Sequence, residues 1–261
     1  IILAEHLLYP ERHSYKLDFM SIDYLKYNMR FNSDFFQSKK DISTLFDLEI
    51  SNQEFYCCER SDIMFQIYPL QKQKLVSSSL YDYYEKIEKP LIEVLSDIEK
   101  TGVYIDAQIL QKLSIELSDT INAITNQIFS ISGYEFNINS PQQLAILMFD
   151  ELQLKQIKKR STAVEVLRVL KNHHPIAELV LQYRHLTKLK NTYLDAFPKY
   201  INKKSNKIHT SFNQTTTITG RLSSSNPNFQ NIPIRTEQSK KIRKAFCAQS
   251  NDSQIISADY S

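Results

Sequence analysis

The sequence predicts an α+β fold in which helices come first and a small sheet follows. Between residues 80 and 197, apolar side chains recur every three or four residues, the period of one helix face. Beyond residue 198, short stretches of β-branched and alternating residues indicate strands. With 261 residues, of which 42% are hydrophobic and 23% charged, the chain can bury one large core or two modest ones.

Residues 1–79 are acidic and rich in aromatic side chains at irregular helical spacings. We interpret them as short helices with a turn near Tyr9-Pro10 and a serine-rich linker at residues 77–79. The cysteines at 57, 58 and 247 have no zinc-ligand spacing, and adjacent cysteines make a poor disulfide, so we expect small buried hydrophobic residues. The six histidines also lack metal-ligand spacing, and we assign them no chemistry.

The helical section has clear start and stop signals. Pro90 marks either a kink or the first turn of a second helix, and Gly102 is expected to end that helix. After an extended piece at residues 103–105, Asp106 should cap a long helix that Gly133 closes. Three further helix starts are predicted at Ser140-Pro141, at a capping box from Thr162 to Glu165, and at His174-Pro175.

The final section is predicted to contain the strands. Residues 208–212 and 215–219 are rich in β-branched side chains, and residues 254–259 form another expected strand. The run from Ser223 to Asn228 has turn chemistry, because short polar side chains there can hydrogen-bond their own backbone. We expect the segment from Thr215 to Arg235 to present its donors and acceptors outward, as a recognition surface.

Charge is divided unevenly along the chain. Residues 1–154 carry 13 Lys and Arg against 23 Asp and Glu, residues 155–244 carry 19 against 4, and residues 245–261 carry none against 2, giving −10, +15 and −2. The basic middle section favours a polyanionic partner such as nucleic acid, although lysines on solvated helix faces remain an alternative. One such face holds Arg184 and Lys188, one helical turn apart.

The length of the apolar runs and the two ends of the chain indicate where the protein is located and whether the sequence is a fragment. No apolar run is long enough to span a bilayer, so we expect no membrane association and a cytoplasmic location. We also expect a monomer. The chain does not begin with Met and ends in a predicted strand, whose unpaired edge is unusual for a natural domain. We therefore expect a fragment.

Four motifs in one order resemble the polymerase domain of family A DNA polymerases, the bacterial DNA polymerase I type. They are Thr219-Gly220-Arg221-Leu222-Ser223-Ser224, the run from Pro227 to Arg235, Ile242-Arg243-Lys244-Ala245-Phe246, and Ala258-Asp259-Tyr260-Ser261. The resemblance covers residues 80–261. It implies that residues 1–79 are the end of a degenerate 3′–5′ exonuclease-like domain, 80–207 the start of the polymerase domain with a helical thumb, and 208–261 a partial palm.

The resemblance implies a two-metal reaction on DNA. Asp259 would be the first Mg²⁺-binding aspartate, and the backbone carbonyl of Tyr260 would help to hold the second of two ions. The partners would be primer–template DNA and dNTPs, in replication and repair within the bacterial nucleoid. The resemblance places the second catalytic aspartate and the fingers after Ser261. Asp259 would then be the single catalytic carboxylate of this chain, and one carboxylate cannot hold two metal ions. We therefore expect this chain to be inactive by itself.

The resemblance also implies which residues contact DNA. Arg221, Asn228 and Gln230 match positions that contact the duplex near the primer end, mostly in the minor groove, where donors can check pairing without reading sequence. Asn231 and Arg235 lie in the same block, where a structural hydrogen-bonding role is an alternative. The thumb, whose tip is expected to be shorter than in the family pattern, would grip the duplex with a set of basic residues. That set is Lys158, Lys159, Arg160, Arg184 and Lys188.

The exonuclease-like part departs from the family pattern. Counting from Tyr56, Arg60 stands where the resemblance implies a metal-binding aspartate, and a guanidinium cannot ligate Mg²⁺. We predict no proofreading activity, while a shifted register would bring Asp62 into consideration instead. The alternative function for the whole chain is a non-enzymatic duplex-binding module or a degenerate gene product.

Overall fold

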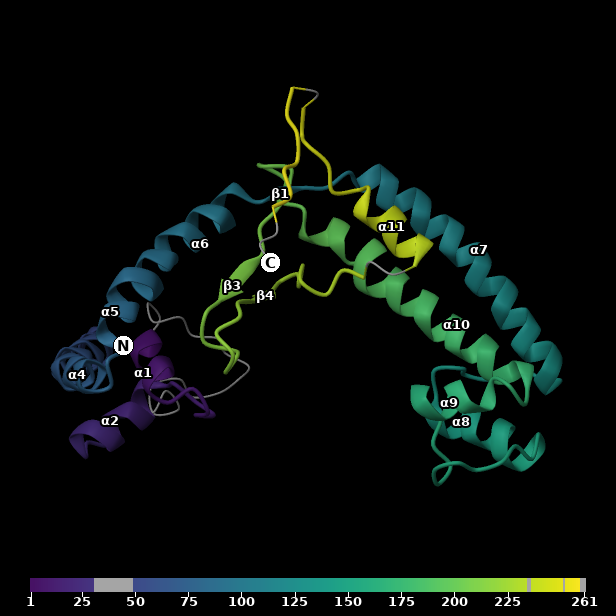
Figure 1. Cartoon of the computed structure of the whole chain (residues 1–261), viewed down its shortest axis with the longest axis horizontal. Helices are drawn as coiled ribbons and strands as arrows, with labels where there is room; N and C mark the ends of the chain where they lie inside the picture. Colours follow the sequence, from purple (N-terminus) through teal and green to yellow (C-terminus); the bar gives the residue numbers. More distant parts are fainter. Residues whose placement is uncertain (31–48, 234–235, 251, 259–261) are drawn as a thin grey trace. The chain divides into compact units, whose positions relative to one another are not determined.

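The computed structural model describes residues 1–30, 49–233, 236–250 and 252–258 (Figure 1). The chain divides into two compact units. Unit 1 is Ile1–Thr101 with Ser211–Ser225, and unit 2 is Gly102–Thr210 with Asn226–Ser261. Both contain helices and a small antiparallel sheet, so the predicted α+β class is confirmed. The domain boundaries expected at 79/80 and 207/208 stay a prediction.

Unit 1 is built on helices that come from the first hundred residues, together with one hairpin. Its elements are α1 (Ile2–Leu8), α2 (Leu17–Leu25), α4 (Ile50–Ser77), α5 (Tyr81–Tyr83), the π-helical turn η2 (Tyr84–Glu88), α6 (Lys89–Thr101), β3 (Ser211–Asn213) and β4 (Ser223–Ser225). Pro90 is the second residue of α6, as expected for the first turn of a new helix.

The prediction of short helices throughout residues 1–79 was wrong for α4, which is one helix of 28 residues. Pro69 lies inside it, although proline removes a backbone donor and disfavours a helix interior. The helix is held by packing, because Ile63 and Ile67 are buried against Met20 and Met29. Tertiary burial therefore outweighs the local penalty at Pro69.

The strands of unit 1 differ from those predicted. Residues 215–219 form bends and turns rather than a strand, and Ser223–Ser225, which we had assigned to a turn, forms β4. In the antiparallel hairpin, Ser211 pairs with Ser225 and Asn213 with Ser223. The predicted strand at 208–212 is also split, because Ile208 ends β2 and Ser211 begins β3.

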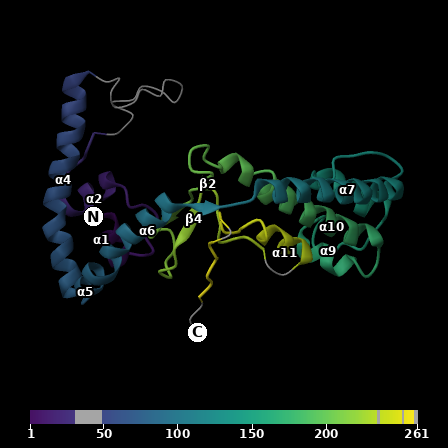
Figure 2. The ribbon, with the colours of Figure 1, turned by 90° about the horizontal axis from the view of Figure 1, so that it is seen from above.

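Unit 2 combines helices with the short sheet of β1 and β2. Its elements are β1 (Val103–Tyr104), α7 (Ala107–Ser132), α8 (Pro141–Ala145), the π-helical turn η3 (Ile146–Glu151), α9 (Val164–Leu170), α10 (Pro175–Leu189), the π-helical turn η4 (Lys190–Leu194), the 3₁₀ turn η5 (Phe197–Tyr200), β2 (Lys207–Ile208) and α11 (Glu237–Arg243). Helix α10 packs against both α7 and α9, as Figures 1 and 2 show.

The helix boundaries of unit 2 follow the predicted signals. Asp106 accepts from the backbone N–H groups of residues 108 and 109, Ser140 from that of 143, and His174 from that of 176. Gly133 ends α7 in the left-handed conformation. The capping box was wrong, because α9 begins after Ala163 without a side-chain cap, and Thr162 lies outside the helix.

Three further predictions concern the strand at residues 254–259, the burial of the cysteines and the presence of membrane-spanning segments. The described residues 254–258 form no strand, and Ile255 and Ile256 are 61% and 89% exposed, so the strand predicted for 254–259 was wrong over this part. Cys57 and Cys58 are exposed and Cys247 is half-buried, which contradicts the expectation of buried cysteines. Within the described ranges, no helix is both long and apolar enough to cross a bilayer.

Candidate nucleic-acid interface

Arg221 lies on the loop that joins β3 and β4 in unit 1. Its side chain is exposed, and its backbone carbonyl accepts a hydrogen bond from the hydroxyl of Thr217. The hairpin is fastened to α6, because Glu99 accepts from the Phe212 N–H at 2.5 Å. Gln214 donates to the Glu88 carboxylate at 2.8 Å, next to the start of the loop. The loop is therefore anchored at one end while Arg221 faces solvent.

Asn228, Gln230 and Asn231 lie together on an exposed loop of unit 2. The Asn228 side-chain oxygen accepts from the Gln230 N–H at 2.9 Å, which makes a turn and commits that oxygen to the backbone. At the start of the loop, the Thr210 hydroxyl donates to the Pro227 carbonyl at 2.8 Å. These bonds fix the backbone and leave the side chains on the exposed side of the loop.

Aromatic side chains hold this loop from beneath. The rings of Phe197, Phe229 and Phe246 meet edge to face, with centroids 5.6 to 6.0 Å apart. Tyr193 packs on Phe197 and donates from its buried phenol to the Asn231 carbonyl. Burial raises the pKa of Tyr193, so the phenol stays protonated and can donate. Sequence analysis gave Tyr193 no role beyond the apolar period of residues 80–197 and therefore missed this one.

The basic residues assigned to the thumb have two different environments. Lys158 and Lys159 are exposed on the loop before α9, but Arg160 forms a two-bond ion pair with Asp150 at 2.5 and 2.7 Å. The Asp150 pKa is lowered by this hydrogen bond. The charge of Arg160 is therefore partly neutralised within the protein.

Helix α10 shows the same contrast. Arg184 donates to the backbone carbonyl of Thr162 at 2.5 Å and to its hydroxyl at 3.3 Å, and burial lowers the Arg184 pKa. Lys188, one turn later, is exposed. Arg184 therefore braces the entry to α9, while the ammonium of Lys188 remains in solvent. The sequence offered no signal for the bond between Thr162 and Arg184, because they are 22 residues apart.

The predicted metal ligands Asp259 and Tyr260, and the predicted DNA contact Arg235, lie outside the described residues. In the part of the chain that the structure describes, no group of three or more His, Cys, Asp or Glu side chains is placed to hold a metal ion. The described residues therefore do not by themselves form a two-metal site.

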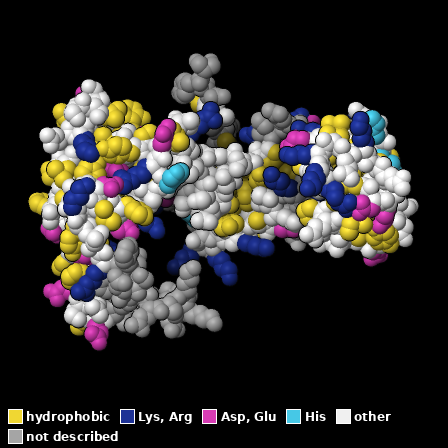
Figure 3. All heavy atoms as spheres, turned by 90° about the horizontal axis from the view of Figure 1, so that it is seen from below, with side chains coloured by type: hydrophobic (Ala, Val, Ile, Leu, Met, Phe, Trp, Pro, Cys, Tyr) yellow, Lys and Arg dark blue, Asp and Glu magenta, His cyan; other side chains and the backbone are white. Residues whose placement is uncertain are grey.

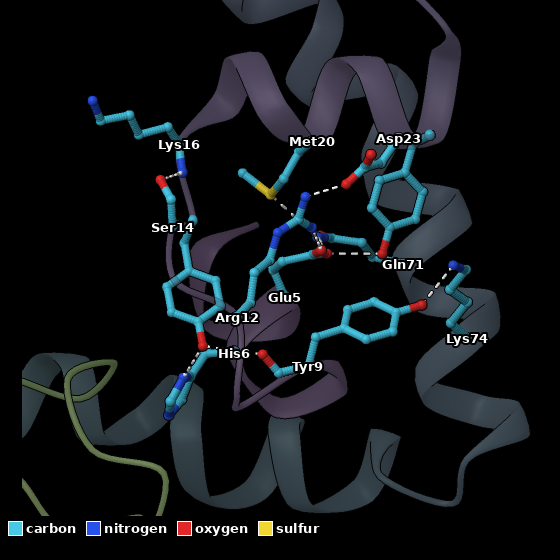
Figure 4. Close-up of polar contacts among 12 residues, drawn as sticks. Glu5, His6, Tyr9, Arg12, Ser14, Lys16, Met20, Asp23, Gln71 and Lys74 are labelled. Atoms are coloured by element: carbon cyan, nitrogen blue, oxygen red, sulfur yellow. Dashed lines mark hydrogen bonds and ion pairs between the residues drawn. The ribbon is translucent and has the colours of Figure 1, made fainter.

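Unit 1 contains a buried polar cluster whose charged groups pair with one another, while the buried side-chain oxygen of Gln71 has no hydrogen-bond partner among the described residues. The fully buried Glu5 accepts from Tyr24 and Gln71 at 2.8 Å each and pairs with Arg12, which also pairs with Asp23 (Figure 4). A cavity of about 720 Å³ opens beside it. Burial and the bond to Glu5 raise the pKa of Tyr24. Because these charges satisfy one another, the cluster serves to brace α1, α2 and α4.

Arg60, at the position of the implied exonuclease aspartate, is tied to its own helix. Its guanidinium lies 3.4 Å from the centre of the Tyr56 ring and donates to the Tyr56 carbonyl at 3.2 Å. The neighbouring Glu59 accepts from the Tyr27 phenol at 3.0 Å, and Asp62 accepts from Gln66 at 2.7 Å. Each of these polar side chains has a partner within the protein.

Comparison with known proteins identifies a single family. The model of DNA polymerase family A matches residues 107–261. DNA polymerase I of Treponema pallidum is 37% identical over 273 residues, covering 99% of this chain and 26% of the relative, and that of Borreliella burgdorferi is 39% identical over 248 residues, covering 94% and 27%. The thermostable DNA polymerase I of Thermus thermophilus is 47% identical over 184 residues, covering 68% and 22%.

A solved structure is similar over most of the chain. The POL domain of Pol1 from M. smegmatis, in complex with DNA primer-template and dNTP, aligns with a TM-score of 0.78 and 31% identity, covering 94% of this chain and 40% of that one. The chain spans about a quarter of the length of the curated relatives. These likenesses agree with the resemblance carried by the four sequence motifs.

Proposed function

We propose, because this chain belongs to DNA polymerase family A, that it forms the primer–template-binding part of a DNA-directed DNA polymerase, a nucleotidyltransferase that extends a primer from dNTPs. The observation that carries the proposal is the family match over residues 107–261, a range that includes Arg221, Asn228, Gln230 and Asp259. The M. smegmatis structure supports it as a relative in complex with DNA primer-template and dNTP.

The proposed roles follow from the chemistry of the exposed loops. The minor-groove edge of every correct base pair presents O2 or N3 acceptors, so guanidinium and amide donors can test pairing without reading sequence. Arg221 on the unit 1 loop, and Asn228 and Gln230 on the unit 2 loop, supply such donors. Asn231 is proposed to hold the loop in place, because its backbone carbonyl accepts a hydrogen bond from the Tyr193 phenol. Arg235 is proposed as a phosphate contact.

The basic residues of unit 2 are proposed to hold the product duplex. Lys158, Lys159 and Lys188 are exposed cations that can neutralise phosphates directly. Arg160 and Arg184 add charge but already bind Asp150 and Thr162, so their main part is to fix the shape of the surface. The working protein is proposed to be a monomer that acts at the bacterial nucleoid in replication and repair.

Asp259 is proposed to supply a carboxylate to Mg²⁺, with the Tyr260 carbonyl beside it, since hard divalent cations prefer oxygen ligands. A two-metal site needs more carboxylates than this one. Residues 1–261 taken alone are therefore proposed to bind primer–template without extending it. Proofreading is proposed to be absent, because Arg60 occupies the place of a metal ligand.

Binding is tested by fluorescence anisotropy of a labelled primer–template duplex with the 261-residue chain. Between about 50 and 200 mM salt, affinity should fall by orders of magnitude, because each phosphate contact releases counterions. Absence of binding at the lowest salt would overturn the proposal. The double variant Asn228→Ala/Gln230→Ala should lose preference for a matched over a mismatched primer end, whereas Asn191→Ala/Gln249→Ala, two exposed amides elsewhere in unit 2, should keep it.

Catalysis is tested separately from binding. The chain alone should bind duplex but add no nucleotide in Mg²⁺, and extension by it would contradict the proposed division of labour. In a protein that carries this segment together with a complete metal site, Asp259→Asn should abolish extension and leave duplex binding intact. Asp252→Asn, an exposed carboxylate seven residues earlier, is the matched control and should extend normally.

The alternative function, a non-enzymatic duplex-binding module, is favoured by the basic section of residues 155–244. It predicts the same salt dependence but no preference for a matched primer end. The comparison of matched and mismatched ends therefore separates the two functions. A 3′-labelled single strand incubated with the chain and Mg²⁺ should remain intact, and its degradation would contradict the absence of proofreading.

A further inference from the structure

An acidic pocket opens on unit 1 where the end of α2 meets the first half of α4. Its volume is about 470 Å³, within the range that small-molecule sites occupy. Exposed apolar side chains are common on unit 1 (Figure 3), so apolar walls alone do not distinguish this pocket. The distinguishing feature is its charge, because the described residues that line it include two carboxylates, Glu59 and Asp62, and no basic side chain.

Glu59 is the buried carboxylate of the pocket, with 4% of its side chain exposed. Its Oε1 accepts from the Tyr27 phenol at 3.0 Å and from the Arg30 N–H at 3.2 Å. Its Oε2 is buried and accepts no hydrogen bond within the described ranges. A buried carboxylate oxygen without a donor costs free energy, so a donor that a ligand brings to Glu59 would be stabilised.

Arg60 compensates the charge of Glu59 only in part. Its guanidinium lies 3.6 Å from Glu59 Oε2, longer than a hydrogen bond, and donates to the Tyr56 carbonyl at 3.2 Å. Asp62, one helical turn further along α4, is exposed and accepts from the neutral amide of Gln66 at 2.7 Å. The pocket therefore keeps negative charge at its floor and at its rim.

The phenol of Tyr27 responds to this negative charge. Its hydrogen bond to Glu59 raises the pKa of Tyr27, and burial and the charges of Glu59 and Asp62 act in the same direction. A second negative charge is thus disfavoured at the pocket wall. A ligand that carried an anionic group would meet the same repulsion.

The walls of the pocket suit the body of an organic cation. Tyr27 and Phe55 supply aromatic rings, and Ile63 supplies a buried apolar surface. Phe55 already holds a cation, because the Arg30 guanidinium lies 4.2 Å from the centre of its ring. Mg²⁺ and Ca²⁺ need more oxygen ligands than two carboxylates, and in the described part of the chain no three acidic, His or Cys side chains converge.

We propose that this pocket binds a small primary ammonium compound with an apolar body. The ammonium group donates to Asp62, and to Glu59 Oε2 after a turn of the carboxylate, whose terminal torsion is soft. The apolar body packs on the rings of Tyr27 and Phe55. The site uses none of the residues proposed to contact DNA, so it goes beyond the proposed function and does not depend on it.

The test titrates the 261-residue chain with 2-phenylethylammonium and with its neutral analogue 2-phenylethanol, followed by protein NMR. The ammonium should bind roughly tenfold or more tightly than the alcohol, because a charged donor makes the stronger hydrogen bond to a carboxylate. Equal affinities, or no saturable binding of the ammonium at millimolar concentration, would overturn the proposal. Displacement of the ammonium by an equal concentration of Mg²⁺ would also overturn it, in favour of a metal site.

Substitutions on α4 separate the pocket from general attraction. Glu59→Gln keeps an acceptor for Tyr27 but removes the charge, and Asp62→Asn removes a charge from an exposed position where folding is not at risk. Each should weaken binding of the ammonium and leave binding of the alcohol unchanged. Glu54→Gln, an exposed carboxylate of the same helix outside the pocket, is the matched control and should bind both ligands normally. Equal losses in Asp62→Asn and Glu54→Gln would contradict the site.

Cys58 allows the ligand to be located, because it lines the pocket while its exposed neighbour Cys57 does not. Two chains, Cys57→Ser/Cys247→Ser and Cys58→Ser/Cys247→Ser, each keep one of these thiols. Saturating 2-phenylethylammonium should slow alkylation of Cys58 by iodoacetamide several-fold and leave the rate at Cys57 unchanged. Equal rates at Cys58 with and without the ammonium would place the ligand elsewhere and overturn the assignment of the pocket.

Discussion

Tyr193 donates a hydrogen bond from its phenol to the backbone carbonyl of Asn231. The donor lies on η4, at the end of the α10 helix, and the acceptor lies on the exposed loop that carries Asn228 and Gln230. One partly buried hydrogen bond therefore connects the helical part of unit 2 to its candidate minor-groove loop. The edge-to-face packing of Tyr193 on Phe197 fixes the direction of the phenol.

Tyr193→Phe should destabilise the protein and loosen this loop. The substitution keeps the ring and its packing but removes the donor, which should cost about 1 kcal/mol. Primer–template affinity should also fall, because the loop becomes less ordered before binding. Thermal unfolding and fluorescence anisotropy measure the two effects. Tyr200→Phe, an exposed tyrosine of the same unit, should change neither, and an unaltered affinity in Tyr193→Phe would show that the bond does not position the loop.

Arg184→Lys should weaken folding more than it weakens binding. The guanidinium binds both the carbonyl and the hydroxyl of Thr162, and a single ammonium cannot reproduce that fork. We expect a loss of roughly 1–2 kcal/mol, because Thr162 is buried and is left incompletely bonded. Chemical denaturation measures this loss.

Lys188, on the same helix as Arg184, should affect DNA binding and not stability. Lys188→Gln removes an exposed ammonium that has no partner among the described residues, so the unfolding midpoint should not move. The slope of DNA affinity against salt should instead fall by about 1. If Arg184→Lys left the unfolding midpoint unchanged, the proposed bracing of α9 by Arg184 would be wrong.

Local signals were sufficient to predict the helix boundaries of unit 2. Asp106, Ser140 and His174 each bond backbone N–H groups two or three residues ahead, so the interaction is contained in the sequence pattern. Gly102 and Gly133 both have positive φ, as helix-ending glycines require. These features depend on a few neighbouring residues and on no distant partner.

Long-range pairing explains the predictions that were wrong. The β-branched run at 215–219 has higher strand propensity than Ser223–Ser225, but only the serines lie opposite β3 in the hairpin. Thr162 has a good capping-box pattern, yet Arg184, 22 residues away, takes its hydroxyl and carbonyl. In the candidate site, Arg160 was predicted as a DNA contact from the family resemblance, and the carboxylate that pairs with it became visible only in the structure.

Gly102→Ala should be strongly destabilising. Gly102 has φ of +63°, and an added Cβ would lie 2.7 Å from the His209 ring and 3.0 Å from the Ile208 carbonyl oxygen. The ring cannot move away easily, because it is hydrogen-bonded to Ser205 at 2.7 Å. We expect a loss of roughly 2–4 kcal/mol from backbone strain and overlap together, measured by urea denaturation.

A second glycine separates the two causes of that loss. Gly133 has φ of +79° but open space around it, so Gly133→Ala should show backbone strain alone, about 1 kcal/mol. Adding His209→Ala to Gly102→Ala should recover stability relative to the sum of the two single changes. Equal losses in Gly102→Ala and Gly133→Ala would mean that contact with His209 contributes nothing.

Asp195 should make the stability of the protein depend on pH in the acid range. Its carboxylate accepts from Lys190 at 2.6 Å and from Ser114 of α7 at 2.7 Å. Burial alone would raise the pKa of Asp195, but the hydrogen bonds from Lys190 and Ser114 outweigh it and lower the pKa. The folded state therefore binds a proton less readily than the unfolded state. Its contribution to stability is complete above the unfolded pKa of about 4 and is lost as pH falls through the lower folded value.

Asp195→Asn should therefore destabilise the chain at neutral pH by about 0.5–1 kcal/mol, a small value because the pair is partly exposed to solvent. The difference from the unaltered chain should shrink as pH falls below about 4, since the native aspartate is then protonated as well. Urea unfolding at a series of pH values measures both free energies. Asp119→Asn, an exposed carboxylate on α7, should follow the unaltered chain at every pH. A constant difference between Asp195→Asn and the unaltered chain would assign the loss to packing or to the Ser114 bond, rather than to the charge of Asp195.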